Sequence, residues 1–459
     1  MPHLYISAAH KSSGKTTISV GVCAALRERG LKVQPFKKGP DFIDPLWLGR
    51  AAGRPCYNLD YQTQSAEEMV GLFARLQIGA DIGLIEGNKG LHDGVALDGS
   101  NSNAAVAKAL GAPVILVIDV RGMSRGVAPI ALGFQAFDPQ ARIAGVIFNQ
   151  VGGPRHEGKL RRVMAAYTDL PVLGAVYRCD EMRIDERHLG LIPSTESTES
   201  ERRIEAIRRV VSEQVDLDAL IRIARTAPTP PVSPTPPRPM AFRGIRVAIP
   251  RDRAFGFYYP DDLAIFEAVG AQLRFFDALA DARLPEADAL FIGGGFPETQ
   301  LDALADNRAL LTAIHAAIEG GLPAYAECGG LMYLSRALHW RGRRRELAGI
   351  IPGEVHMQPR PVGRGYVTLE ALDHPWGLEP GARLHAHEFH HSSLTGLPAD
   401  ADFAFRVVRG HGIDGRRDGY RRHRLLAGYA HQRHTAANPW TERFLAFAAR
   451  CKTGNSQPG

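Results

Sequence analysis

A proline-rich stretch near the middle of the chain limits what this sequence can fold into more than any other feature. Half of residues 226–239 are proline. Proline fixes φ and has no amide donor, so such a stretch is typical of an extended linker and not of a core. The sequence therefore predicts a linker at 226–242 between domains at 1–225 and 243–450, with a flexible polar tail at 451–459. A length of 459 residues agrees, because single cores rarely grow so large.

Short apolar runs alternate with longer segments of helical pattern on both sides of the linker. Nearly continuous apolar runs of this length are typical of buried parallel strands that are joined by helices. Each half is therefore predicted to be an α/β domain built around a parallel sheet. The predicted strands are 4–7, 82–85, 114–119, 143–149, 172–176, 245–249, 273–276, 289–292 and 324–326.

Composition excludes several classes of protein. The net charge of +6 is mild, and the arginine-rich runs at 341–345 and 416–424 are interpreted as solvated surface, so no nucleic-acid partner is expected. The N-terminus lacks the pattern of a signal peptide, and no apolar run is long enough to span a membrane. Five scattered cysteines without metal-like spacing favour a reducing compartment. The prediction is a soluble cytoplasmic protein.

The segment Ala9-His-Lys-Ser-Ser-Gly-Lys15-Thr16 matches a phosphate-binding loop, except that Ala9 replaces the first glycine. It follows a predicted strand and opens a predicted helix, where backbone amides and the helix dipole favour phosphate. Lys15 would pair with the β- and γ-phosphates of ATP, and Thr16 would hold Mg²⁺. The predicted ATP-binding residues are Ser13, Gly14, Lys15, Thr16, Thr17 and Asn149. The alternative is an ordinary strand-to-helix turn, and for Asn149 a strand-end cap.

Acidic residues gather on loops where such a fold places strand ends. Asp41 and Asp44 lie in one loop, and Glu86 and Asp93 lie in another. Carboxylates beside a triphosphate favour a Mg²⁺ site, because the cation neutralises both groups. Each cluster taken alone is also compatible with a turn or a helix cap.

Cys328 lies between a predicted strand and a predicted helix, and two glycines follow it. Such a turn exposes a nucleophile at a helix N-terminus, where a thiolate is favoured. The amides of Gly294 and Gly295, with that of Gly329, are the predicted oxyanion and glutamine contacts. His431 is the predicted base. A buried structural cysteine is the alternative.

Together these residues resemble the cobyrinic acid a,c-diamide synthase family, which amidates side-chain carboxylates of tetrapyrroles. The resemblance covers nearly the whole chain in order. The matching segments are the phosphate loop, 39–45, 86–94, 121–125, 145–149, 254–259, 293–298, 326–334 and 387–390.

The resemblance implies a P-loop dethiobiotin-synthetase-like domain with a parallel sheet, joined to a class I-like glutamine amidotransferase α/β domain. The implied reaction amidates a tetrapyrrole polycarboxylate through an acyl phosphate, with ATP, Mg²⁺ and ammonia from L-glutamine; a homodimer is left open. Cys328 is the implied nucleophile, and His431 activates it. The implied metal residues are Thr16, Asp41 and Glu86, and the implied substrate residues are Asp41, Phe42, Asp44 and Asp93.

Departures from the family pattern leave alternatives open. Lys38 and Lys89 add cations in loops expected to face the substrate, and His92 replaces an aromatic residue. These changes favour a branch that amidates sirohaem as the alternative to cobyrinate. The histidine motif carries one extra residue before Asn438-Pro439, so His434 competes with His431 as the base. No glutamate stands two residues after His431, so a complete Cys-His-Glu triad is not visible. The alternative from another class is a P-loop regulatory ATPase with an idle amidotransferase domain.

Overall fold

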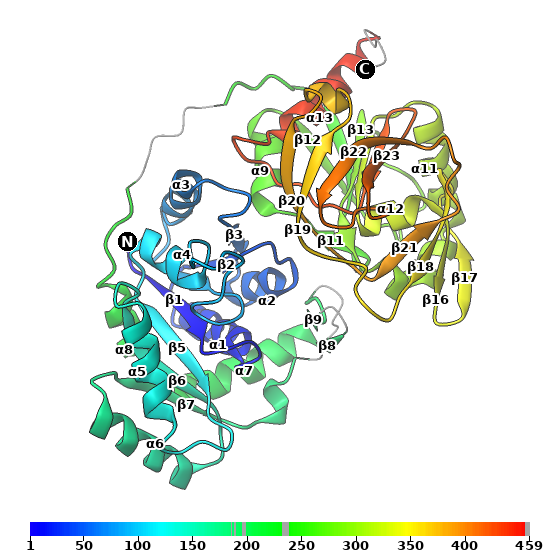
Figure 1. The fold of residues 1–459 in the computed structure, drawn as a ribbon. Coiled ribbons are helices and arrows are strands. Elements are labelled where there is room, and N and C mark those ends of the chain that lie inside the picture. Colours follow the sequence, from blue (N-terminus) through cyan, green and yellow to red (C-terminus); the bar gives the residue numbers. More distant parts are fainter. Residues whose placement is uncertain (185, 188–189, 195–198, 232–237, 455–459) are drawn as a thin grey trace. The chain divides into compact units, whose positions relative to one another are not determined.

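The computed structural model describes residues 1–184, 186–187, 190–194, 199–231 and 238–454. The chain forms two compact units, Met1–Thr235 and Pro236–Gly459 (Figure 1). The predicted linker at 226–242 contributes residues to both units. Thr229 accepts a hydrogen bond from the N-terminal amine in the first unit, and Phe242 packs against the core of the second. Residues 232–237 lie outside the described part.

A seven-stranded parallel sheet forms the centre of the first unit. Its strand order is β3-β2-β4-β1-β5-β6-β7. The strands are β1 (His3–Ala8), β2 (Val33–Lys38), β3 (Tyr57–Leu59), β4 (Ile82–Glu86), β5 (Val114–Asp119), β6 (Ile143–Val151) and β7 (Val172–Tyr177). Because β1 has β4 on one side and β5 on the other, loops on both sides of it meet at the carboxyl edge, where α/β proteins bind ligands.

Helices cover both faces of this sheet, so the first unit has three layers (Figure 1). One face packs against α1 (Lys15–Glu28), α2 (Ile43–Ala52), α7 (Ser200–Gln214) and α8 (Leu217–Ala224). The other packs against α3 (Ala66–Leu76), α4 (Asn103–Leu110), α5 (Val127–Phe137) and α6 (Pro154–Tyr167). The short elements η1 (Asp180–Met182), β8 (Glu186–Arg187) and β9 (Gly190–Leu191) follow β7. Burial on two faces explains why most of these strands read as continuous apolar runs.

Strand β2 is an exception that the sequence pattern did not predict. It contains Pro35, Lys37 and Lys38, yet it lies between β3 and β4 and all its residues are buried. Proline and lysine normally argue against a central strand. The strand is tolerated here because Lys37 has carboxylate partners at the end of the sheet.

The second unit contains a nine-stranded sheet that is only partly parallel. Its order is β12-β10-β13-β15-β24-β23-β22-β19-β20. The parallel strands are β10 (Arg246–Pro250), β12 (Gln272–Phe276), β13 (Ala289–Ile292), β15 (Ala324–Glu327) and β24 (Leu425–Gly428). The antiparallel extension is β19 (Gly363–Ala371), β20 (Arg383–His390), β22 (Asp402–Arg409) and β23 (Arg417–Arg422). The extension was not predicted, because its strands are rich in charge.

Helices and small sheets complete this unit. One face of the large sheet packs against α9 (Pro260–Ala268) and α13 (Trp440–Lys452), and the other against α10 (Leu301–Asp306), α11 (Arg308–Glu319) and α12 (Gly329–Leu334). The small sheets are β11 (Phe255–Phe257) with β14 (Gly294–Gly295), and β17 (Arg343–Glu346), β16 (Ser335–Trp340), β18 (Ile351–Met357) and β21 (Ser392–Thr395). The 3₁₀ turns are η2 (Pro297–Gln300) and η3 (Pro375–Gly377). Helix α13 includes two residues, 451 and 452, that the sequence assigned to the tail.

The arginine-rich runs are largely neutralised within the second unit. Arg345 pairs with Asp302 and Asp306, and Arg421 pairs with Asp373 and Asp402. None of the helices in the described part of the chain combines the length and hydropathy that crossing a bilayer requires.

Two candidate active sites

The predicted phosphate-binding loop connects β1 to α1 at the centre of the first sheet. Gly14 caps the helix with φ 84°, a left-handed conformation that favours glycine. A Cβ at Gly14 would lie 2.0 Å from Asn149 Nδ2. The same Asn149 nitrogen donates a hydrogen bond of 2.9 Å to the carbonyl of Ser13. Asn149 therefore supports the loop directly, and the loop requires glycine at this point.

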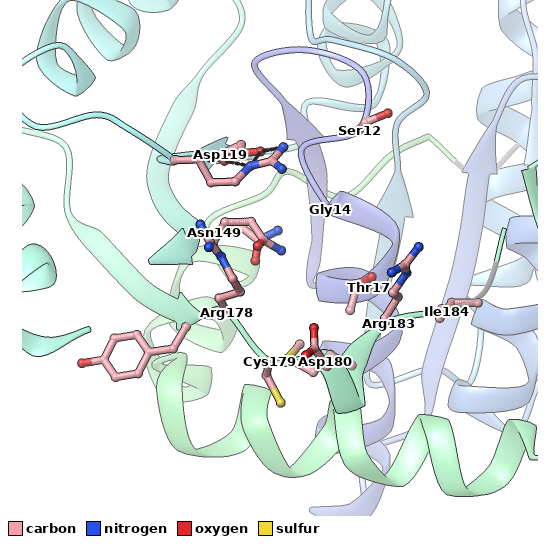
Figure 2. Close-up of a pocket in the computed structure, with 14 residues that line it drawn as sticks. Ser12, Gly14, Thr17, Asp119, Asn149, Arg178, Cys179, Asp180, Arg183 and Ile184 are labelled. Carbon is pink, nitrogen blue, oxygen red and sulfur yellow. Dashed lines mark hydrogen bonds and ion pairs between the residues drawn. The ribbon is translucent and has the colours of Figure 1, made fainter. Parts of the chain in front are cut away.

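A pocket of 670 Å³ opens on the β5–β7 side of the loop (Figure 2). It includes Gly14, Thr17 and Asn149 from the predicted site. Figure 2 also shows Arg178 and Arg183, from the segment after β7, which the sequence analysis missed because nothing local marks that segment. The pocket is lined by Ser12, Gly14, Thr17, Asp119, Arg121, Asn149, Gln150, Tyr177, Arg178, Cys179, Asp180, Met182, Arg183 and Ile184.

A charged cluster lies on the opposite side of the loop, at the ends of β2 and β4. Lys37 Nζ is 2.5 Å from Asp44 Oδ2 and 2.9 Å from Glu86 Oε1, and it also donates to the Gly87 carbonyl at 3.1 Å. Thr16 Oγ1 lies 2.7 Å from Glu86 Oε1 and 3.3 Å from Asp44 Oδ2. The structure thus brings Thr16, Asp44 and Glu86 together. It adds Lys37, which the sequence analysis did not select.

The electrostatics of this cluster follow from burial and crowding. Burial lowers the pKa of Lys37, but Asp44, Glu86 and Asp41 outweigh it and raise that pKa well above its usual value. Burial and the charge of Asp44 raise the pKa of Asp41 to about 7, against the attraction of Lys37. Burial also raises the pKa of Glu86. Although burial opposes it, Lys37 lowers the pKa of Asp44. Lys15 also interacts with these carboxylates, so three acidic side chains face two lysines in this cluster.

The donor set in this cluster fits Mg²⁺. The buried Glu86 Oε2 has no hydrogen-bond partner among the described residues. Thr16 Oγ1 and Asp44 Oδ2 lie close to the other oxygen of that carboxylate. Asp41 uses Oδ1 to accept amide hydrogen bonds of 2.8 and 3.2 Å from Ile43 and Asp44. Hydroxyl and carboxylate oxygens are the ligands that Mg²⁺ prefers.

The other predicted substrate residues differ in exposure. Lys38 is only 4% exposed, and burial lowers its pKa, so it is not a surface lysine. Lys89 is exposed with φ 42°, while Asp93 is exposed and accepts a hydrogen bond of 2.9 Å from the Gly90 amide. Phe42 is buried at the start of α2.

Cys328 forms a sharp turn between β15 and α12 in the second unit. Its φ and ψ are 46° and −101°, a conformation that non-glycine residues rarely adopt and that is typical of strained functional turns. Its amide donates to the Gly428 carbonyl at 2.8 Å, which ties the turn to β24. A Cβ at Gly329 would lie 2.9 Å from the Gly295 amide nitrogen, so these two predicted oxyanion residues are neighbours.

His431, and not His434, is the histidine that contacts the thiol. His431 interacts with Cys328 and packs against Gly294, where a Cβ would lie 2.4 Å from its Cε1. Burial lowers the pKa of His431, but Cys328 and Glu327 outweigh it and raise the value to about 10. His434 Nδ1 lies 2.6 Å from Thr441 Oγ1, and burial lowers its pKa to about 3.

Two residues beside His431 were missed by the sequence analysis. Glu327 Oε2 lies 3.4 Å from His431 Nδ1. The His387 ring stacks on His431 with centroids 4.8 Å apart, and Tyr259 Oη lies 3.2 Å from His387 Nδ1. The available signals were the position of Glu327 directly before the nucleophile and the place of His387 in the matching segment 387–390.

A third polar group lies away from both sites. Single ligand atoms of His339, Glu354 and His356 all lie within 4.8 Å of one another. Glu354 is already 2.8 Å from Arg344 and 3.0 Å from Arg336. Two guanidinium groups neutralise this carboxylate and oppose a further cation, so the group is explained as an ion network.

Comparisons with known proteins match a family model to each unit of the chain. Residues 6–192 match the CobQ/CobB/MinD/ParA nucleotide binding domain. Residues 246–439 match the CobB/CobQ-like glutamine amidotransferase domain. The two matches cover the loop before α1 and the turn at Cys328.

Similar proteins extend the match to the full length. A protein named cobyrinate a,c-diamide synthase from Magnetococcus marinus is 45% identical and covers 100% of this chain and 99% of its own length. Proteins of the same name from Listeria innocua and Archaeoglobus fulgidus are each 38% identical, over 94% and 98% of this chain and 96% and 98% of theirs. The chain therefore belongs to the cobyrinate a,c-diamide synthase family and is an ATP-using, glutamine-dependent amidoligase.

Proposed function

We propose that the chain converts the a and c side-chain carboxylates of cobyrinate, a tetrapyrrole polycarboxylate, into primary amides. The observation that carries the proposal is that one chain combines the charged cluster of Lys37, Asp44 and Glu86 with the pair of Cys328 and His431. The names of full-length relatives support cobyrinate as the substrate.

Activation of the carboxylate is assigned to the first unit. A substrate carboxylate oxygen attacks the γ-phosphorus of ATP, and the bond from that phosphorus to the β–γ bridging oxygen breaks. The products are ADP and an acyl phosphate. Ammonia then attacks the acyl carbon, the bond to the phosphate oxygen breaks and the nitrogen loses a proton, which gives the amide and inorganic phosphate. Positioning and charge stabilisation supply most of the catalysis in phosphoryl transfer.

The residues of the first unit divide this work. Lys15 would pair with the β- and γ-phosphates. Lys37 would offset the repulsion between the acidic residues and the incoming substrate carboxylate. Thr16, Asp44, Glu86 and Asp41 would hold Mg²⁺, which when bound neutralises triphosphate charge. The pocket at Asn149 would take the remainder of the nucleotide.

Release of ammonia is assigned to the second unit. The Cys328 sulfur attacks the carboxamide carbon of glutamine, and the amides of the neighbouring Gly295 and Gly329 would stabilise the oxyanion. His431 gives a proton to the leaving nitrogen, so ammonia departs as the carbon–nitrogen bond breaks. Water then attacks the thioester, His431 accepts a water proton, and glutamate leaves as the thiol is restored.

The test is mass spectrometry of cobyrinate and of sirohaem after incubation with the full chain, ATP, Mg²⁺ and glutamine. The proposal expects two carboxylates of cobyrinate to become amides. Amidation of sirohaem alone would instead support sirohaem as the substrate. The added cations Lys38 and Lys89 are the sequence feature that favours this alternative. ATP hydrolysis that needs neither tetrapyrrole nor glutamine would overturn the proposal in favour of a regulatory ATPase.

A further inference from the structure

His431 has a second buried partner besides the thiol. Glu327 is the last residue of β15 and directly precedes Cys328. Its Oε2 lies 3.4 Å from His431 Nδ1, and the two side chains are 4% and 3% exposed. A buried carboxylate at this distance from an imidazole interacts strongly with it, because little solvent screens the pair.

The carboxylate is held in a defined orientation by its other oxygen. Glu327 Oε1 accepts hydrogen bonds from Tyr325 Oη at 2.6 Å and from the Gln432 amide at 2.8 Å. Gln432 Nε2 in turn donates to Tyr325 Oη at 3.0 Å. Oε1 is therefore anchored, while Oε2 faces the imidazole. Parallel pairing of β15 with β24, in which Glu327 is opposite Gly428, keeps the two segments in register.

The position two residues after His431, where a Cys-His-Glu triad would have its glutamate, contains a cation instead. Arg433 stands two residues after His431. It is 1% exposed and pairs with Asp261 at 2.9 Å. The chain thus lacks an acid at that position. Glu327, the residue directly before Cys328, brings a carboxylate to His431 instead.

We propose that Glu327 is the positioning residue that orients His431 toward Cys328. The inference rests on the proposed glutaminase chemistry of Cys328. A carboxylate 3.4 Å from Nδ1 favours the proton on that nitrogen and leaves Nε2 for the thiol. The negative charge also stabilises the imidazolium that gives its proton to departing ammonia.

The test compares glutaminase kinetics of the full chain and of Glu327→Gln across pH. The glutamine analogue of the side chain keeps the shape and removes the charge. We expect kcat to fall by about 10²- to 10⁴-fold, in the range of general acid–base and orienting groups, with KM for glutamine nearly unchanged. We also expect the alkaline limb of the kcat/KM profile to move to lower pH, since the imidazolium loses a stabilising charge.

Two further variants separate positioning from folding. Glu327→Asp should recover part of kcat, and Tyr325→Phe, which removes one anchor of Oε1, should lower kcat less than Glu327→Gln. If circular dichroism shows that Glu327→Gln is unfolded, Glu327→Asp and Tyr325→Phe still test the proposal. A folded Glu327→Gln protein with unchanged kcat and pH profile overturns the inference. A Glu327→Asp protein whose kcat is no higher than that of Glu327→Gln also overturns it.

Cys328→Ala distinguishes this failure from failure of the proposed function. If the unmodified chain hydrolyses glutamine and Cys328→Ala does not, the nucleophile assignment stands whatever Glu327 does. If Cys328→Ala keeps full glutaminase activity, the assignment itself is wrong, and the role of Glu327 falls with it.

Discussion

Lys37 and Glu86 are direct partners across two neighbouring strands, and Nζ lies 2.9 Å from Oε1. The two side chains are only 1% and 0% exposed. Their strands, β2 and β4, end beside the phosphate-binding loop, so the buried ion pair includes one of the proposed Mg²⁺ ligands, Glu86.

We expect Lys37→Met to destabilise the first unit, because it leaves Glu86 and Asp44 as uncompensated buried charges. Breaking one side of a buried pair typically costs about 3–5 kcal/mol of unfolding free energy. Urea denaturation measures the change. Adding Glu86→Gln to Lys37→Met should recover part of the loss, and the exposed Lys32→Met should change stability by less than about 0.5 kcal/mol. A Lys37→Met protein as stable as the parent would contradict the buried pair.

Lys15→Ala is expected to lower tetrapyrrole amidation by about 10²-fold or more, because a cation at the transferring phosphoryl group is lost. Glutaminase activity should persist, since Cys328 lies in the other unit. Product analysis and glutamate release measure the two activities. The exposed Lys159→Ala, on α6, is the matched control. Normal amidation by Lys15→Ala would refute the phosphate assignment.

Cys328→Ser is expected to end synthesis from glutamine while synthesis from high ammonium continues. The reason is that a serine hydroxyl is a far weaker nucleophile than a thiolate, whereas the acyl phosphate forms in the first unit. The assay supplies either nitrogen source in turn. Cys451→Ser, in α13, should retain both activities. Loss of both activities in a folded Cys328→Ser protein would count against two separate sites.

The contribution of His431 to stability should decrease as pH rises. Its folded pKa is raised to about 10, whereas an unperturbed histidine titrates near ~6.5. A raised folded pKa means stability that is fully present below about pH 6.5 and is lost as pH passes the folded value. The difference in unfolding free energy between the parent and His431→Gln should therefore shrink from pH 6.5 to 10. A difference that stays constant would exclude a raised pKa.

The combined change Lys38→Val with Lys89→Met tests whether these cations steer an anionic substrate. We expect a higher KM that depends less on salt, and an altered preference between cobyrinate and sirohaem. Lys89→Met should have a modest effect alone, because single exposed charges contribute about 0–1 kcal/mol. Lys38 is buried, so its single variant needs a denaturation control. Unchanged KM, salt response and preference would remove the main argument for sirohaem.

Features encoded by consecutive residues were predictable. Most parallel strands were expected, because burial on two faces leaves a continuous apolar run. The strand β2 was not, since Pro35 and Lys37 contradict that pattern. The charged strands β22 and β23 were missed for the related reason that one face of each carries ion pairs, such as Arg421 with Asp402.

The sequence by itself determined the two local turns on which the proposed sites rest, because the Gly14-Lys15-Thr16 loop and the Cys328 turn depend on neighbouring residues in a strand–loop–helix segment. Only the tertiary structure decided which distant side chains join them. Lys37 meets Glu86, 49 positions away, because β2 pairs with β4. His431 and Glu327 meet because β24 pairs with β15, while His434 is directed to Thr441. Such contacts follow from strand pairing over long separations, which no local pattern of residues encodes.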